Sequence, residues 1–310
     1  MNVFVCLPLT SEQAIRLQNT LPGQNLHFHP APEPSPVARE VFGSCQIVFG
    51  NPPPSWIADS TALRWVQLES VGFGEYASLD WQRPGMQLQM TNLAGFFSEP
   101  VAESILAGIL THYRGIGRLS NLHANRQWTG NELRPLLKIM NGAQVVLFGK
   151  GDINRRVADL LAPFKCKIQS FGRNWERPEL QNALVEADIV ICAVPDSPST
   201  RGVFDRNLIS SIKHGGLFVN FGRGSLIDED ALADALENRH LAGAVIDVTN
   251  DEPLPPDHRF WTYPNLLLTQ HTGGGTADEV DRKIDFFLAN FDRLQRKEPL
   301  HSVVNFVKVQ

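Results

Sequence analysis

Short apolar runs separated by clusters of turn residues occupy roughly the first 95 residues of the chain. The runs have strand length, whereas residues 11–20 have the length and polarity of a helix, with Ser11 as a candidate N-cap. Three consecutive prolines in the segment 51–55 exclude a helix interior or a central strand there. This alternation predicts an open parallel sheet. The strands expected in this part are residues 1–8, 45–50, 65–68 and 86–92.

A second series of elements, with a stronger pattern, begins at Gly142. A short buried strand at 145–148 is followed by a glycine-rich turn at 149–152 and by a helix that Pro163 ends. The repeated alternation of strands and helical stretches favours the α/β class, with doubly wound parallel sheets. The further strands expected here are residues 165–171, 189–194, 216–220, 243–248 and 265–269.

Two long apolar stripes at helical spacing predict helices at residues 99–123 and 277–296. The stretch 124–141 is polar and broken, so we expect it to form an arm rather than a core element. Because 310 residues exceed what one hydrophobic core usually supports, the chain is expected to form two domains.

Composition narrows the class of partner. A hydrophobic content of 43% with 20% charged residues is ordinary for a globular protein, and a net charge of −5 does not favour nucleic acid or a membrane surface. The N-terminus has no basic segment and only a short apolar run, so we expect no signal peptide and a cytoplasmic protein with reduced thiols. No run of eighteen apolar residues predicts a membrane helix. No metal site is expected, because no pair among the four cysteines has zinc-ligand spacing: Cys6, Cys45, Cys166 and Cys192.

The turn at 149–152 has the context of a dinucleotide-binding loop, between a strand and a helix. Gly149 allows the tight turn, Gly151 lets the backbone approach a pyrophosphate, and the helix that starts at Asp152 and Ile153 offers free N–H groups. Asn154 stands where a third glycine is usual, and the Asp152 carboxylate is unfavourable beside a phosphate. Taken alone, the motif is equally compatible with a plain strand–turn–helix connection.

The end of the next strand discriminates between the two nicotinamide dinucleotides. A free ribose 2′-hydroxyl is usually bound by a carboxylate at this place, but the strand ends in Gly172 and Arg173. A guanidinium forms charge-assisted hydrogen bonds to a 2′-phosphate. We therefore expect NADP(H) to be preferred, with NAD(H) as the weaker cofactor; the alternative is that Arg173 is a solvated loop arginine.

Three segments near the C-terminal ends of predicted strands carry the remaining motifs. Residues 220–228 contain Arg223, residues 246–255 contain Glu252, and residues 269–274 contain His271. With these segments in this order, the sequence resembles the D-isomer-specific 2-hydroxyacid dehydrogenase family, including its glyoxylate/hydroxypyruvate reductases. The resemblance extends from about residue 63 to residue 305 and is weaker at the N-terminus.

The resemblance implies an oxidoreductase that interconverts a small 2-keto acid and a 2-hydroxy acid, with a catalytic trio. Hydride transfer at the substrate C2 requires its oxygen to gain or lose a proton, and a histidine suits this step, so His271 is assigned as the acid/base. Glu252 would orient that imidazole, and Arg223 would bind the substrate carboxylate and polarise the carbonyl. By position, Pro195 and Asp247 would contact the cofactor. Main-chain N–H groups of a glycine-rich loop would also bind the substrate: Val71, Gly72, Phe73 and Gly74.

Each member of the trio also has a plainer interpretation. Alone, His271 could be structural or exposed, Glu252 a turn residue, and Arg223 an ion-pair partner; Asp228 is most simply an N-cap. The chain also departs from the family pattern, because Gln270 replaces the proline usual before the histidine. This departure does not remove a catalytic group.

The resemblance also implies a domain organisation. A flavodoxin-like substrate domain is expected at residues 1–95 with 288–310, and a Rossmann-type cofactor domain at 96–287, with a cleft between them. The arm at 122–141 would contribute to a homodimer. Two rivals stay open: a dinucleotide-sensing regulatory protein on the same fold, and an enzyme of the phosphoglycerate dehydrogenase type.

Overall fold

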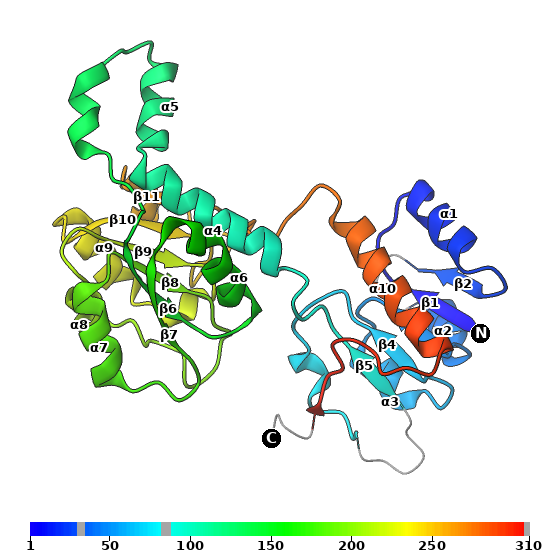
Figure 1. The fold of residues 1–310 in the computed structure, drawn as a ribbon. Coiled ribbons are helices and arrows are strands. Elements are labelled where there is room, and N and C mark those ends of the chain that lie inside the picture. Colours follow the sequence, from blue (N-terminus) through cyan, green and yellow to red (C-terminus); the bar gives the residue numbers. More distant parts are fainter. Residues whose placement is uncertain (30–34, 82–87, 307–310) are drawn as a thin grey trace. The chain divides into compact units, whose positions relative to one another are not determined.

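The computed structural model describes residues 1–29, 35–81 and 88–306. The chain forms two compact units, each built on one parallel sheet with helices on both faces (Figure 1). Unit 1 comprises Met1–Phe96 and Thr276–Gln310, and unit 2 comprises Phe97–Gly275. The predicted fold class, α/β with two doubly wound parallel sheets, is confirmed.

The sheet of unit 1 has five parallel strands in the order β2-β1-β3-β4-β5, which is the flavodoxin-like order. Of these, β2 has no counterpart among the predicted strands, because it lies at the sheet edge and its residues are only partly buried. Residues 86 and 87 of the last predicted strand lie outside the described residues. The strands are β1 (Asn2–Val5), β2 (Asn25–Phe28), β3 (Ile47–Phe49), β4 (Trp65–Gln67) and β5 (Gln89–Thr91).

The helices of unit 1 cover the sheet in two layers (Figure 1). One face packs against α1 (Ser11–Thr20) and α10 (Glu279–Gln295), and the other against α2 (Pro36–Gly43) and α3 (Pro54–Asp59). A 3₁₀ turn, η1 (Gly74–Tyr76), follows β4.

The N-terminus of α1 corrects one prediction. Thr10, not Ser11, is the N-cap: its side chain accepts a hydrogen bond from Gln13 N, and the Gln13 side chain accepts one from Thr10 N. This reciprocal arrangement satisfies two N–H groups at once, which Ser11 could not do one position later because the residue three after it is Ala14.

The boundary between the units differs from the expected one at residues 287 and 288, which would divide α10. The helix lies wholly in unit 1. Its apolar stripe packs on the sheet of that unit, where Phe287 stacks on Phe49 at 4.4 Å and on Trp65 at 5.1 Å between ring centroids. The periodicity of the helix reveals an apolar face, but not the sheet that covers it.

The sheet of unit 2 has six parallel strands in the order β11-β10-β9-β8-β6-β7. The chain passes from β6 to β7 on one side and then crosses to β8 on the other, so the order reverses at β6. Ligands of open parallel sheets bind outside the carboxyl ends of the strands at such a reversal. The strands are β6 (Gln144–Phe148), β7 (Lys167–Phe171), β8 (Ile189–Cys192), β9 (Gly216–Asn220), β10 (Leu241–Ile246) and β11 (Leu266–Leu268).

Helices also cover both faces of this sheet (Figure 1). On one face lie α4 (Ser98–Tyr113) and α6 (Asp152–Leu161), and on the other α7 (Arg177–Glu186), α8 (Arg206–Ser211) and α9 (Glu229–Glu237). Four 3₁₀ turns complete the unit: η2 (Gly130–Leu136), η3 (Ala162–Phe164), η4 (Gly224–Leu226) and η5 (Arg259–Thr262). Across the described part of the chain, no helix is both long enough and apolar enough to cross a bilayer.

The single helix expected at residues 99–123 is two helices. Gly115 has a φ of 64°, a left-handed conformation that interrupts the helix between α4 and α5 (Ile116–Ala124). Within unit 2, α5 projects away from the sheet, as Figure 1 shows, and it buries none of its own residues. The arm expected at 122–141 therefore begins earlier, at α5, and includes η2.

Candidate active site

The glycine turn after β6 has the shape that a pyrophosphate requires. Gly149 has a φ of 115°, and a Cβ atom there would lie 2.6 Å from the carbonyl oxygen of Ala193. Gly151 is the N-cap of α6, has open space where a Cβ would be, and among the described residues no side chain caps this helix. The N–H groups of the first turn of α6 are thus available to an anion, so these residues fit a dinucleotide phosphate.

Asn154, in the place of the third glycine, stabilises the turn with its side chain. Its buried side-chain amide donates to the carbonyl oxygens of Phe148 (3.1 Å) and Gly149 (2.9 Å). No described residue donates a hydrogen bond to its Oδ1 atom. The asparagine therefore adds two hydrogen bonds that hold the turn.

The Asp152 carboxylate is less unfavourable for phosphate binding than the sequence indicated. Its carboxylate forms an ion pair with the guanidinium of Arg155, one turn further along α6. Both side chains are exposed, so the pair is screened by water, but it offsets the negative charge near the turn. Ile153 is half-buried and packs on the apolar cluster beneath α4 and α6.

Two cations lie at the carboxyl end of β7. Arg173 is exposed there, and a Cβ atom on Gly172 would lie 3.0 Å from the Lys150 Cδ atom, so the Lys150 side chain lies alongside Gly172. The residues that follow β7 up to Trp175 include no carboxylate. Sequence reasoning missed Lys150, because nothing in the glycine motif indicates which way its variable residue points.

His271 and Glu252 form a close pair. The Nδ1 atom of His271 is 2.6 Å from Glu252 Oε2, and the other carboxylate oxygen accepts the N–H of Thr249 at 3.0 Å. Burial raises the pKa of Glu252, but the hydrogen bonds from His271 and Thr249 and the charges of His271 and Arg223 outweigh it, so the pKa lies below its ordinary value. Glu252 is thus held as a carboxylate that can orient and stabilise an imidazolium.

The turn that presents His271 is strained and is held by Asp247. Gln270 and His271 have φ angles of 53° and 55°, and the Thr272 N–H donates to the carbonyl oxygen of Thr269, as in a β-turn of type I′. The buried Asp247 Oδ1 atom accepts the Thr269 hydroxyl at 2.6 Å and the N–H groups of Thr272 and Gly273 at 3.1 Å each. Sequence reasoning predicted Asp247 only as a cofactor contact; its position directly after a buried strand was the one signal of this structural role.

Arg223 lies in the loop between β9 and η4, and its side chain is exposed. Asn220 shapes this loop, because its side chain accepts the Gly222 N–H at 3.0 Å and donates to the Arg223 carbonyl oxygen at 3.0 Å. A Cβ atom on Gly222 would lie 2.8 Å from the carbonyl oxygen of Val194. The close approach of the β8 end explains why glycine stands here. The exposed Pro195 follows Val194 on that segment.

A pocket of about 420 Å³ contains the His271–Glu252 pair. It lies wholly in unit 2, so the fold brings together three predicted site residues from the ends of β10 and β11. Its remaining surface is mostly apolar. The lining residues are Asp247, Thr249, Glu252, Pro253, Leu254, Trp261, Leu268, Gln270 and His271.

The predicted substrate loop Val71–Gly74 belongs to unit 1 and follows β4. Its carbonyl oxygens are bound by local side chains, since the Ser70 hydroxyl donates to Gly72 O and the Asn92 amide to Val71 O, both at 2.7 Å. Gly72 and Gly74 have open space at their Cβ positions. Phe73 packs edge-on against Phe306, which is the behaviour of a core residue.

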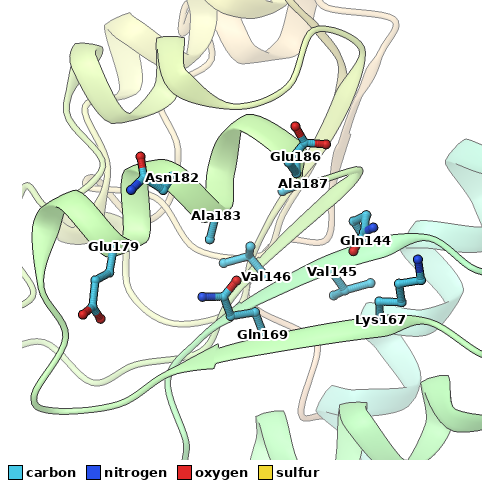
Figure 2. A pocket seen from close by; sticks show the side chains of 10 residues that line it. All are labelled: Gln144, Val145, Val146, Lys167, Gln169, Glu179, Asn182, Ala183, Glu186 and Ala187. Carbon is cyan, nitrogen blue, oxygen red and sulfur yellow. The ribbon is translucent and has the colours of Figure 1, made fainter.

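A second hollow, of about 510 Å³, lies in unit 2 between α7 and the strands β6 and β7 (Figure 2). Gln144 and Lys167, at the amino ends of these strands, line it together with Glu179 and Glu186 of α7. It is thus at the opposite end of the strands from the Gly149 turn. No described site residue predicted from the sequence contributes to it.

Comparison with known proteins adds the family. The sequence profile of the D-isomer specific 2-hydroxyacid dehydrogenase NAD-binding domain matches residues 106–273. The chain belongs to this family. A relative from Corynebacterium melassecola, named only by its position in the proB 3′ region, is 32% identical over 70% of this chain and 74% of its own length. The glyoxylate/hydroxypyruvate reductase A of Arabidopsis thaliana is 27% identical over 86% of this chain and 88% of its own.

Solved structures of the family have the same fold. An NADPH-dependent glyoxylate/hydroxypyruvate reductase from Sinorhizobium meliloti superposes with a TM-score of 0.76 at 21% identity, over 99% of this chain and 98% of that one. Family membership confirms the predicted function at its general level: this 2-hydroxyacid dehydrogenase is an oxidoreductase dependent on a nicotinamide dinucleotide. The matched segment lies within unit 2 and includes the glycine turn, Arg223, Glu252 and His271.

Proposed function

We propose that Arg223, Glu252 and His271 carry out the interconversion of a small 2-keto acid and its 2-hydroxy acid. The observation that carries this proposal is the 2.6 Å contact between His271 and Glu252 inside a pocket that Asp247 also lines. The bound dinucleotide supplies or accepts the hydride at the substrate C2. The residues of the chain must therefore bind the acid, polarise its C2–O bond and move one proton.

His271 moves that proton. Its Nδ1 atom is held by the Glu252 carboxylate, so the Nε2 atom is the nitrogen that gives a proton to the carbonyl oxygen during reduction and takes it back during oxidation. The lowered pKa of Glu252 keeps the carboxylate charged, which stabilises the imidazolium form needed for reduction. Arg223 supports the same step by binding the substrate carboxylate and withdrawing charge from the carbonyl oxygen. The main-chain N–H groups of Val71–Gly74 are the second carboxylate-binding element of the proposal.

NADP(H) is the proposed preferred cofactor, with NAD(H) as the weaker one. Gly149, Gly151, Asp152 and Ile153 would hold the pyrophosphate at the N-terminus of α6, and Pro195 and Asp247 would flank the nicotinamide. Arg173 would bind the 2′-phosphate. Lys150 supports this assignment, because its side chain lies against Gly172 and adds a second positive charge at the carboxyl end of β7.

Small 2-keto acids such as glyoxylate, hydroxypyruvate and pyruvate form the proposed substrate class. Two relatives named glyoxylate/hydroxypyruvate reductases support it, from Arabidopsis thaliana and Photorhabdus laumondii.

We also propose a cytoplasmic homodimer that associates through α5 and η2. The arm exposes Ile116, Leu119 and Leu136, and Trp128 is 96% exposed, which is a large apolar surface for a free monomer.

Turnover tests the proposed function. Oxidation of NADPH is followed at 340 nm with a panel of 2-keto acids, for the wild type and for His271→Gln. Loss of general acid–base catalysis should lower kcat about 10²- to 10⁴-fold. Binding of the dinucleotide without turnover of any keto acid would favour the regulatory protein instead, and turnover of phosphorylated substrates alone would favour the phosphoglycerate dehydrogenase type.

A further inference from the structure

A second glutamate–histidine pair lies next to the Glu252 loop. Glu229, the first residue of α9, places its Oε2 atom 3.7 Å from the Nε2 atom of His258. Its other oxygen accepts the N–H of Asn250 at 2.8 Å. The Glu229 side chain is only 15% exposed, and a hydrogen bond to a carboxylate is stronger than one between neutral groups.

The loop that Glu229 holds is the one that carries Glu252. Asn250 N–H donates to Glu229, and its neighbour Thr249 N–H donates to Glu252, whose second oxygen contacts His271. Two adjacent N–H groups of one loop are therefore taken by two different carboxylates. A displacement of Asn250 would move the Thr249 N–H away from Glu252.

The same segment also contacts the loop that carries Arg223. Gly224 follows it directly, and a Cβ atom on Gly224 would lie 2.0 Å from the Thr249 carbonyl carbon, so the backbones of the two loops are in contact. Five residues later, Glu229 makes the second attachment to the same loop. The β9–α9 connection thus holds the Thr249–Glu252 loop at two points.

His258 lies beside the Glu229 carboxylate. The His258 Nδ1 atom accepts the N–H of Phe260 at 3.3 Å, so the ring proton of the neutral form is on Nε2, which faces Glu229. At 3.7 Å the contact with His258 is longer than a hydrogen bond, so the N–H of Asn250 is the donor that orients the carboxylate.

We propose that Glu229 is a positioning residue of the reaction: through the Asn250 N–H, it sets the Glu252 carboxylate against His271. This inference rests on the proposed roles of Glu252 and His271. Glu229 acts by accepting the Asn250 N–H at one oxygen, so the length of its side chain matters more than its charge.

Two substitutions of Glu229 separate the effect of side-chain length from the effect of charge. Glu229→Asp keeps the negative charge at the N-terminus of α9, where it is favourable, but is shorter by about 1.5 Å and loses Asn250. Glu229→Gln keeps the length and an acceptor oxygen but removes the charge. We expect kcat with a keto acid to fall about tenfold in Glu229→Asp and less than threefold in Glu229→Gln, with the dissociation constant of NADPH unchanged in both.

Asp228→Ala is the matched structural control. It removes the N-cap hydrogen bond from Ala231 N at 2.9 Å and lowers the melting temperature, but leaves Asn250 untouched. We expect kcat of this variant to stay within twofold of the wild type at a temperature where all variants are folded. Equal kcat in Glu229→Asp and the wild type, an equal loss in Glu229→Gln and Glu229→Asp, or a loss in Asp228→Ala as large as in Glu229→Asp would overturn the proposal.

A second readout needs neither substrate nor cofactor. The Nδ1–H proton of His271, hydrogen-bonded to Glu252, should give a downfield NMR resonance that is absent in His271→Gln. We expect this resonance to be the same in Glu229→Gln as in the wild type, and to be shifted or broadened in Glu229→Asp. An identical resonance in the wild type, Glu229→Gln and Glu229→Asp would overturn the inference. If the wild type turns over no keto acid, the proposed function fails, and this resonance still decides the role of Glu229.

Discussion

Arg173 offers the sharpest test of cofactor preference at the scale of single residues. Arg173→Ala should raise the KM for NADPH about tenfold, equivalent to about 1.4 kcal/mol, and leave the KM for NADH within about twofold, because only NADPH has the 2′-phosphate. Arg155→Ala is the comparison variant: it removes the partner of Asp152 beside the pyrophosphate turn, so it should raise the KM for NADPH and for NADH alike. A wild type that prefers NADH would contradict the assignment.

Glu252 should make stability depend on pH in a defined direction. Its pKa is lowered in the folded protein, so the folded state favours the carboxylate, and this stabilisation is present at neutral pH and disappears as the pH falls through the folded pKa. The difference in urea midpoint between the wild type and Glu252→Gln should therefore be largest at pH 7 and shrink below about pH 4.3. A difference that grows on acidification would show that the fold does not favour the charged form.

At the scale of elements, the turn after β11 depends on a left-handed pair. Proline fixes φ near about −65°, so Gln270→Pro cannot adopt the observed 53° and should displace His271, lowering kcat/KM at least tenfold and the melting temperature with it. Gln270→Gly accepts this φ and should keep near-wild-type activity. Steady-state kinetics and thermal unfolding of the two variants decide; a fully active Gln270→Pro would show that the turn is not required.

The prediction of elements from the sequence succeeded where local patterns decide the outcome. Asp228 was correctly expected as an N-cap, because its side chain needs only the N–H of Ala231, three residues away. Prediction failed where the partner is distant: α10 shows a clear apolar stripe, yet only the packing of Phe287 on Phe49 assigns it to unit 1. The break at Gly115 is a third case, since an isolated glycine in an apolar stripe is compatible with a continuous helix.

At the scale of the whole molecule, the exposed arm predicts association. The wild type should have twice the chain mass of 34.5 kDa in light scattering, and Leu119→Asp on α5 should run as a single chain because a charge would be buried in the interface. Val185→Asp is the matched control: Val185 is an exposed apolar residue of α7, outside the arm, and the variant should stay a dimer. A monomeric wild type would contradict the proposed interface.

The sequence by itself determined the α/β class, the strands of unit 2, the glycine turn and the identity of Arg223, Glu252 and His271 as candidates. These features are local, since strand length, turn chemistry and motif order depend on residues that are close together in the sequence. Only the tertiary structure decided that His271 and Glu252, nineteen residues apart, meet at 2.6 Å, that Asp247 holds the strained turn, and that Glu229 reaches Asn250. Each of these contacts joins the ends of different strands or helices, and the packing of the sheet, not the local pattern, sets which ends are neighbours.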